Sequence, residues 1–230
     1  MPTKAKLLIF PWIVAGMGLL VATLAWDFRF PEPARFVTCL ALALLGSTFK
    51  IRLPRMQGTL SINFVLVLIA IAQMTLTEAL VVGVSGTLVQ SVWRTRTRPR
   101  LAQVLFNIST LTVSVILAFV VLDALRNSGA LIPGLVVAAV LFFIVNSGLV
   151  SLVLALLNSQ SAISIWRNYH RWAFPYYLGG AALAGLVTVY SAVCGWRLAF
   201  AMLPLMYMLY YCYESWIAAR AHDESPIPVG

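Results

Sequence analysis

Long apolar runs recur along nearly the whole chain and are separated by short polar or basic stretches. A helix of about 20 apolar residues is long enough to cross the roughly 30 Å hydrocarbon core of a bilayer. The pattern therefore predicts an all-α, polytopic membrane helix bundle, with a single transmembrane domain at residues 1–219 and a loose cytoplasmic tail at 220–230. We expect eight membrane segments, at residues 7–26, 35–49, 60–74, 76–92, 101–123, 132–157, 173–194 and 197–215.

The apolar stretch at residues 59–92 is too long for one ordinary span and short for two. Within it, Thr75 and Glu78 match the S/T-x-x-E pattern of a capping box, in which a hydroxyl and a carboxylate satisfy free backbone N–H groups at a helix start. The pattern predicts a break near Thr75 and two short helices, at about 60–74 and 76–92. These form either two thin spans or a re-entrant pair, and both arrangements return the chain to the same side of the membrane.

Composition strengthens the membrane assignment. The chain is 61% hydrophobic and only 10% charged, whereas a soluble domain carries roughly 25% charged residues. Its mean hydropathy is +0.93. So few charged side chains cannot cover a soluble surface, and the apolar runs leave no room for a separate soluble catalytic domain.

The Lys and Arg side chains are distributed unevenly between the two sides of the predicted membrane. If the N terminus is cytoplasmic, only Arg29, Arg35, Arg126 and Arg197 of the 16 basic residues lie on the outer side. Such an excess on cytoplasmic loops is the positive-inside pattern. It explains the net charge of +9 without a nucleic-acid partner. We expect a multi-pass protein of the inner (plasma) membrane, with the lipid bilayer as partner and both termini cytoplasmic.

Four arginines alternate with other residues in one cytoplasmic loop, at Arg94, Arg96, Arg98 and Arg100. A cluster of this kind fixes topology, binds anionic lipid head groups or contacts an acidic partner. The sequence leaves these three roles open.

Several uncharged polar side chains lie in or beside the apolar segments, most of them in the predicted cytoplasmic half. Burying an amide without a hydrogen bond is costly, so these groups either bond one another across helices or meet a small lipophilic ligand in a pocket open to the cytoplasm. The candidate ligand-binding residues are Asn63, Gln90, Gln103, Asn107 and Asn146.

The first apolar segment carries small residues at about one-turn spacing, at Ala15, Gly16, Gly18 and Ala22. Small side chains allow another helix to approach closely in a membrane. This face either packs within the chain or forms a helix-docking surface for a separate subunit.

Few residues suit acid–base or metal chemistry. There are seven acidic residues and two histidines, and the sequence contains no HExxH motif, no paired carboxylates and no Cys/His cluster. We therefore predict no catalytic residue, no metal site and no cofactor. A lipid-modifying enzyme is the third hypothesis for function, and it requires His170 or Glu214 to face a cavity near the inner leaflet.

Several short motifs from Lys50 onward resemble the MASE-like membrane modules that precede GGDEF or HD-GYP domains in bacterial signalling proteins. The resemblance implies a module that senses something in or near the membrane and signals to a cytoplasmic domain or partner. Only a short tail follows the last predicted span, so we expect a stand-alone relative, a truncated module or a protein with a different task. The motifs are Lys50–Pro54, Gly58–Phe64, Glu78–Leu80, Leu88–Trp93, Arg98–Arg100, Gln103–Asn107, Trp166–Arg167 and Phe174–Gly180.

The chain is also similar, in size, basic charge and small-residue faces, to the substrate-binding subunits of energy-coupling-factor transporters. This second resemblance implies a small-molecule transport subunit that docks its transporter partner through a face such as Ala15, Gly18 and Ala22. Such a subunit needs a cavity reachable from outside the cell.

Overall fold

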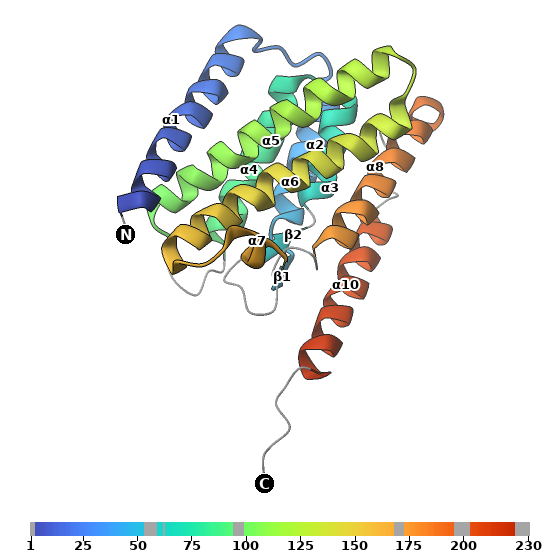
Figure 1. Ribbon diagram of the computed structural model, residues 1–230. Helices are drawn as coiled ribbons and strands as arrows, with labels where there is room; N and C mark the ends of the chain where they lie inside the picture. Colours follow the sequence, from blue (N-terminus) through green and yellow to red (C-terminus); the bar gives the residue numbers. More distant parts are fainter. Residues whose placement is uncertain are drawn as a thin grey trace.

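The structure is a computed structural model that describes residues 3–52, 59–61, 63–93, 99–167, 173–195 and 203–223. It is a helical bundle with one short β-hairpin, and helices occupy all eight ranges that the sequence predicts (Figure 1). The elements are α1 (Thr3–Trp26), α2 (Pro33–Gly46), β1 (Lys50–Arg52), β2 (Thr59–Ser61), α3 (Asn63–Gln73), α4 (Leu76–Val92), α5 (Leu101–Asn127), α6 (Leu131–Asn158), α7 (Ala162–Ile165), α8 (Phe174–Cys194) and α10 (Leu203–Asp223).

Successive long helices run in alternating directions (Figure 1). The start of α1, the β-hairpin and the end of α10 lie at one end of the bundle, here called the hairpin end. The connection at residues 27–32 and the turn at 128–130 lie at the other, here called the break end because α3 and α4 meet there. Both ends of the described chain are thus on the same side of the bundle.

Helix α3 is the centre of the bundle. Each of its residues from Asn63 to Ala72 is at most 7% exposed, and α2, α4, α5, α6 and α8 all contact it. A helix that is apolar on every side must be surrounded by protein or by lipid. The sequence reads NFVLVLIAIAQ, without a polar stripe, and here the surroundings are other helices of the protein.

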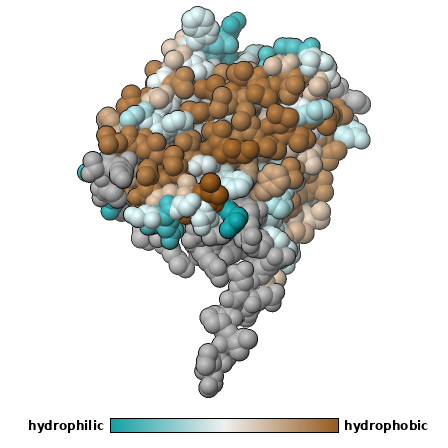
Figure 2. Space-filling view, viewed as in Figure 1, coloured by the Kyte–Doolittle hydropathy of each residue, from teal (hydrophilic) through white to brown (hydrophobic). Residues whose placement is uncertain are grey.

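The outer surface of the bundle is apolar. Figure 2 shows a broad hydrophobic face over α5 and α6. Exposed apolar side chains of these two helices include Val120, Val136 and Ile144. A soluble monomer rarely exposes so large a continuous apolar area. In the described part of the chain, α1, α5 and α6 are long and apolar enough to cross a membrane. The protein is therefore a membrane protein, while the full set of eight membrane segments and their orientation stay predictions.

The β-hairpin was not predicted from the sequence. Strands β1 and β2 pair antiparallel, with Ile51 opposite Leu60. Each strand has only three residues in a polar–apolar–polar order, KIR and TLS. Such short runs carry too few alternations to be distinguished from a loop by pattern alone.

Helix α1 packs against α5 at a glycine. A Cβ added to Gly16 would lie 2.4 Å from the Cβ of Ser109 and 2.6 Å from its Cα, and the Ser109 hydroxyl donates a hydrogen bond to the Ile13 carbonyl at 3.2 Å. In contrast, Ala15, Gly18 and Ala22 are exposed, and a Cβ at Gly18 would meet nothing within 4 Å. Three of the predicted small residues, Ala15, Gly18 and Ala22, therefore point away from the rest of the described chain, while the fourth, Gly16, makes the internal contact.

The packing of α1 predicts different effects on stability for substitutions at Gly16 and at Gly18. We expect Gly16→Ala to destabilise the protein by roughly 1–3 kcal/mol, because the added methyl group must displace the α5 backbone. Gly18→Ala should leave stability unchanged or slightly higher, since alanine is the better helix former. Thermal unfolding of the two purified variants in the same detergent tests this, and equal midpoints would contradict the assigned packing.

Candidate functional site

Helix α3 ends at Gln73 and α4 begins at Leu76, and the junction is closed by the predicted capping box. Thr75 is the N-cap residue, with φ −68° and ψ 159°. Its Oγ1 accepts a hydrogen bond from the Glu78 N–H at 3.2 Å, and Glu78 Oε2 accepts one from the Thr75 N–H at 3.0 Å. The Thr75 hydroxyl also donates to Glu78 Oε2 at 3.1 Å. The prediction of a capping box at these two residues is confirmed.

Side chains from distant segments satisfy the free groups at the end of α3. The Arg126 guanidinium at the end of α5 donates to the Ala72 carbonyl. The Arg35 guanidinium of α2 donates to Gln73 Oε1, while Gln73 Nε2 donates to Thr188 Oγ1 of α8 at 3.2 Å. The junction thereby ties α3 to three helices that are far from it in the sequence.

The start of α4 is also attached to the connection between α1 and α2. The Thr77 hydroxyl donates to the Asp27 carbonyl at 2.7 Å, and Thr77 is buried. The charges suit the two helix ends, because cations favour the carboxyl end of a helix and carboxylates favour its amino end. Arg126 lies at the end of α3 and Glu78 lies in the first turn of α4.

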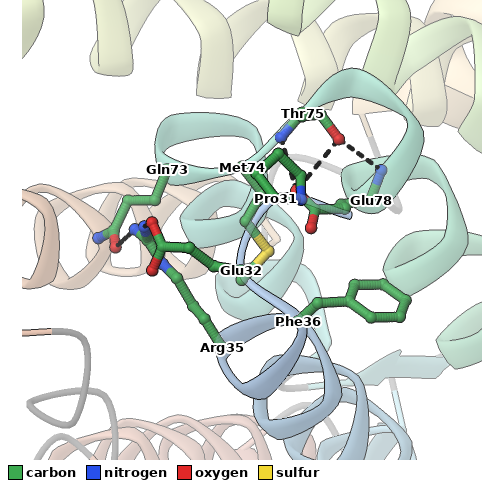
Figure 3. A pocket seen from close by; sticks show the side chains of 8 residues that line it. All are labelled: Pro31, Glu32, Arg35, Phe36, Gln73, Met74, Thr75 and Glu78. Carbon is green, nitrogen blue, oxygen red and sulfur yellow. Dashed lines mark hydrogen bonds and ion pairs between the residues drawn. The ribbon is translucent and has the colours of Figure 1, made fainter. Parts of the chain in front are cut away.

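A cavity of about 90 Å³ opens beside this junction. Figure 3 shows its lining side chains, which come from the start of α2 and from the α3–α4 junction. A cavity of this size has room for several water molecules or one small ligand. It is lined by Pro31, Glu32, Arg35, Phe36, Gln73, Met74, Thr75 and Glu78.

The charged groups of the cavity differ in how they are paired. The Arg35 guanidinium forms an ion pair with Glu32 at 3.3 Å in addition to its bond to Gln73. Glu78 is only 3% exposed, and its Oε2 accepts hydrogen bonds from the N–H and from the hydroxyl of Thr75. Its other oxygen, Oε1, forms no hydrogen bond or ion pair with any described residue. The cavity therefore contains a hydrogen-bond acceptor that is free to meet a ligand.

The sequence identified the capping roles of Thr75 and Glu78 but did not indicate the other residues of this site. Arg35 and Arg126 were interpreted only as outer-side charges, and Gln73 as part of an apolar run. A signal was present, because a helix that ends inside an apolar bundle leaves carbonyl groups that need donors. Arg35 and Arg126 are two of the four arginines on the same predicted side.

Two of the predicted ligand-binding residues lie together near the hairpin end. Asn63, at the start of α3, packs directly on Gly86 of α4, where an added Cβ would lie 2.3 Å from Asn63 Nδ2. Its Oδ1 is buried and has no hydrogen-bond partner among the described residues. One turn further along α4, Gln90 Oε1 accepts a hydrogen bond from the Ser61 hydroxyl at 2.9 Å.

The other three candidates are spread over α5 and α6. Asn146 is half-buried and forms a side-chain hydrogen bond with Tyr177 of α8. The ring centroids of Tyr177 and Phe64 are 4.0 Å apart. On α5, Gln103 is exposed and Asn107 is half-buried. The structure thus brings Asn63 and Gln90 together, and none of the five residues lines the cavity at the break end.

The remaining sequence predictions concern the basic loop and the proposed enzymatic residues. Arg94, Arg96, Arg98 and His170 lie outside the described residues, while Arg100 is exposed at the N-cap of α5. Glu214 is exposed on α10 and is not among the residues that line the cavity at the break end. Within the described part of the chain, no group of three His, Cys, Asp or Glu residues is placed to hold a metal ion.

Comparison with known proteins gives one family. The family model MASE9 matches residues 28–214, which is most of the chain and includes the whole junction and its cavity. No curated protein and no solved structure matches the chain.

The capping box generates a prediction about stability. We expect Thr75→Ala to lower the free energy of unfolding by about 1 kcal/mol, because the Glu78 N–H loses its acceptor inside the bundle. Thr75→Ser keeps the hydroxyl and should retain the native value. Reversible unfolding of both variants in mixed micelles measures the difference. A serine variant as unstable as the alanine variant would show that the methyl group, rather than the cap, matters.

Proposed function

The chain belongs to the MASE9 family of membrane sensory modules, and we propose that it binds a small or lipophilic ligand and signals to a cytoplasmic partner. The observation that carries this proposal is the cavity at the α3–α4 junction. It combines a free acceptor on buried Glu78 with charged and apolar walls from two separate segments. Ligand sites commonly pair mostly apolar walls with a few placed polar groups.

The position of the cavity suits a sensor because it adjoins the central helix. Close-packed interiors transmit displacements rather than absorbing them. Since α3 contacts α2, α4, α5, α6 and α8, a ligand that favoured a different arrangement of the junction would alter many helix contacts. A ligand shifts such an equilibrium only by as much as its affinity differs between the two arrangements.

Helices α3 and α4, which meet at the cavity, both extend from it to the hairpin end. There, Gln90 of α4 is hydrogen-bonded to Ser61 of β2, and the Lys50 ammonium group of β1 donates to the Trp93 carbonyl. By the positive-inside argument the hairpin end is cytoplasmic. A change at the junction would then reach the hairpin, the basic loop with Arg94, Arg96, Arg98 and Arg100, and a partner bound there.

A second candidate function is a substrate-binding subunit of a small-molecule transporter. The exposed face of Ala15, Gly18 and Ala22 on α1 favours it, because a docking helix needs such an uncovered surface. On this proposal the cavity at the break end would be the substrate site reached from outside the cell.

Native mass spectrometry of the full chain, purified gently from its own membrane, tests the ligand. We expect a retained compound of fixed mass. Re-adding it to the emptied protein should change amide hydrogen exchange at residues 59–61 and 90–93, as well as at the junction. Co-purified ATPase subunits would favour the transporter. An empty protein without a partner, or exchange changes confined to the junction, would contradict the sensor proposal.

The polar residues on α5 allow the predicted cytoplasmic pocket to be tested separately. The side chains of Gln103 and Asn107 form no hydrogen bond with any described residue. We therefore expect the Gln103→Leu, Asn107→Leu double variant to keep the wild-type unfolding midpoint in detergent. If these residues line a pocket, the variant should lose a retained ligand. A lower midpoint would instead indicate that the two amides stabilise helix packing.

A further inference from the structure

We infer that the cavity at the α3–α4 junction binds a small organic cation, with an ammonium group placed against the Glu78 carboxylate. The inference rests on the proposed function, because it takes this cavity as the ligand site. It adds the chemical class of the ligand and the atom that recognises it.

The charges around the cavity leave one carboxylate without a cation. Glu32 neutralises Arg35 at 3.3 Å, and Arg126 donates to the Ala72 carbonyl at the end of α3. Glu78 has no ion pair with any described residue. Within the described part of the chain, its side chain is stabilised by the two hydrogen bonds from Thr75 and by the amino end of α4. A buried ion is costly unless it is paired, so a cationic ligand supplies what the site lacks.

The geometry of the carboxylate agrees with this charge. Both hydrogen bonds that the carboxylate accepts from Thr75 go to Oε2, which leaves Oε1 without a partner among the described residues, in a side chain that lines the cavity (Figure 3). An ammonium group donates up to three hydrogen bonds and needs such an acceptor. Glu32, with its side chain 60% exposed, places a second carboxylate at the solvent side of the same cavity.

Other classes of ligand fit less well. An anion would meet two carboxylates and an arginine that is already paired. Calcium requires six to eight oxygen ligands, and the described residues offer no group of three suitable side chains. The volume of about 90 Å³ favours a compound of a few heavy atoms over a lipid, and Pro31, Phe36 and Met74 provide apolar walls for its hydrocarbon part.

The probes are three compounds with one carbon skeleton: propylammonium chloride, sodium propionate and 1-propanol. Each is titrated into the full chain in a zwitterionic detergent at constant ionic strength, and the unfolding midpoint and the Kd from calorimetry are measured. We expect saturable binding and a raised midpoint for propylammonium alone. Binding of propionate, or equal effects of all three probes, would overturn the inference.

Glu78→Gln separates the charge from the structural role. Glutamine serves in a capping box as glutamate does, so the variant should keep the wild-type midpoint without ligand. Its Kd for propylammonium should rise at least tenfold. Unchanged affinity would overturn the inference.

Glu32→Gln gives a second variant that does not depend on the cap, because this side chain is exposed. It leaves Arg35 without its ion pair and should weaken propylammonium binding several-fold. Asp123→Asn is the matched control. Asp123 is also acidic and exposed, at the same end of the bundle, but it does not line the cavity, so its removal should leave the Kd unchanged. An equal loss of affinity in the control would show a general surface-charge effect and overturn the assignment.

The outcomes for the ligand class and for the proposed function are distinguishable. A retained natural ligand that lacks a cationic group, together with no propylammonium binding, would overturn the ligand class and leave the sensory proposal standing. Propylammonium binding that depends on Glu78 but changes no hydrogen exchange at residues 59–61 and 90–93 would support the site and contradict signalling through it.

Discussion

The structure depends on how a helix can stop inside an apolar bundle. Each helix end leaves backbone groups without partners, and neither lipid nor apolar side chains can satisfy them. At the junction of α3 and α4 the partners come from the protein itself. Thr75 and Glu78 satisfy the start of α4, while Arg126 donates to the carbonyl of Ala72. The donors come from helices far apart in sequence, so the same groups that allow the break also fix the positions of α2, α5 and α8 around it.

The sequence predicted the local parts of this arrangement and missed those that depend on tertiary contacts. The break was readable because Thr75 and Glu78 are three residues apart and their pattern has one physical meaning. The hydrogen-bond partners of Gln73 could not be predicted from the sequence, because Arg35 and Thr188 are 38 and 115 residues away from it. For α1, the sequence is apolar on every side, so nothing in it indicated that Gly16 would face α5 and that Gly18 would face outward. The central position of α3 was also beyond the pattern, which predicts burial but not whether lipid or protein surrounds a helix.

Membership in a family of membrane sensory modules gives the junction a functional setting. A sensor needs a site whose occupancy changes a shared element, and α3 is the element that most of the bundle contacts. The charged groups at its carboxyl end and the amide groups near its start occupy opposite ends of one short helix. The first set surrounds the cavity. The second, Asn63 and Gln90, lies beside the hairpin that faces the proposed partner.

The complete burial of α3 also bears on how the protein is made. Its 11 residues extend only about 16 Å, roughly half of a hydrocarbon core. In the two-stage view of membrane protein folding, helices first insert as independently stable spans and then associate. A helix of this length, with its carboxyl end held by arginines of α2 and α5, lacks the properties of such a span. Stable insertion of the α3–α4 pair therefore requires α5, which is synthesised later. The centre of the bundle is thus stably inserted only after α5 has been synthesised.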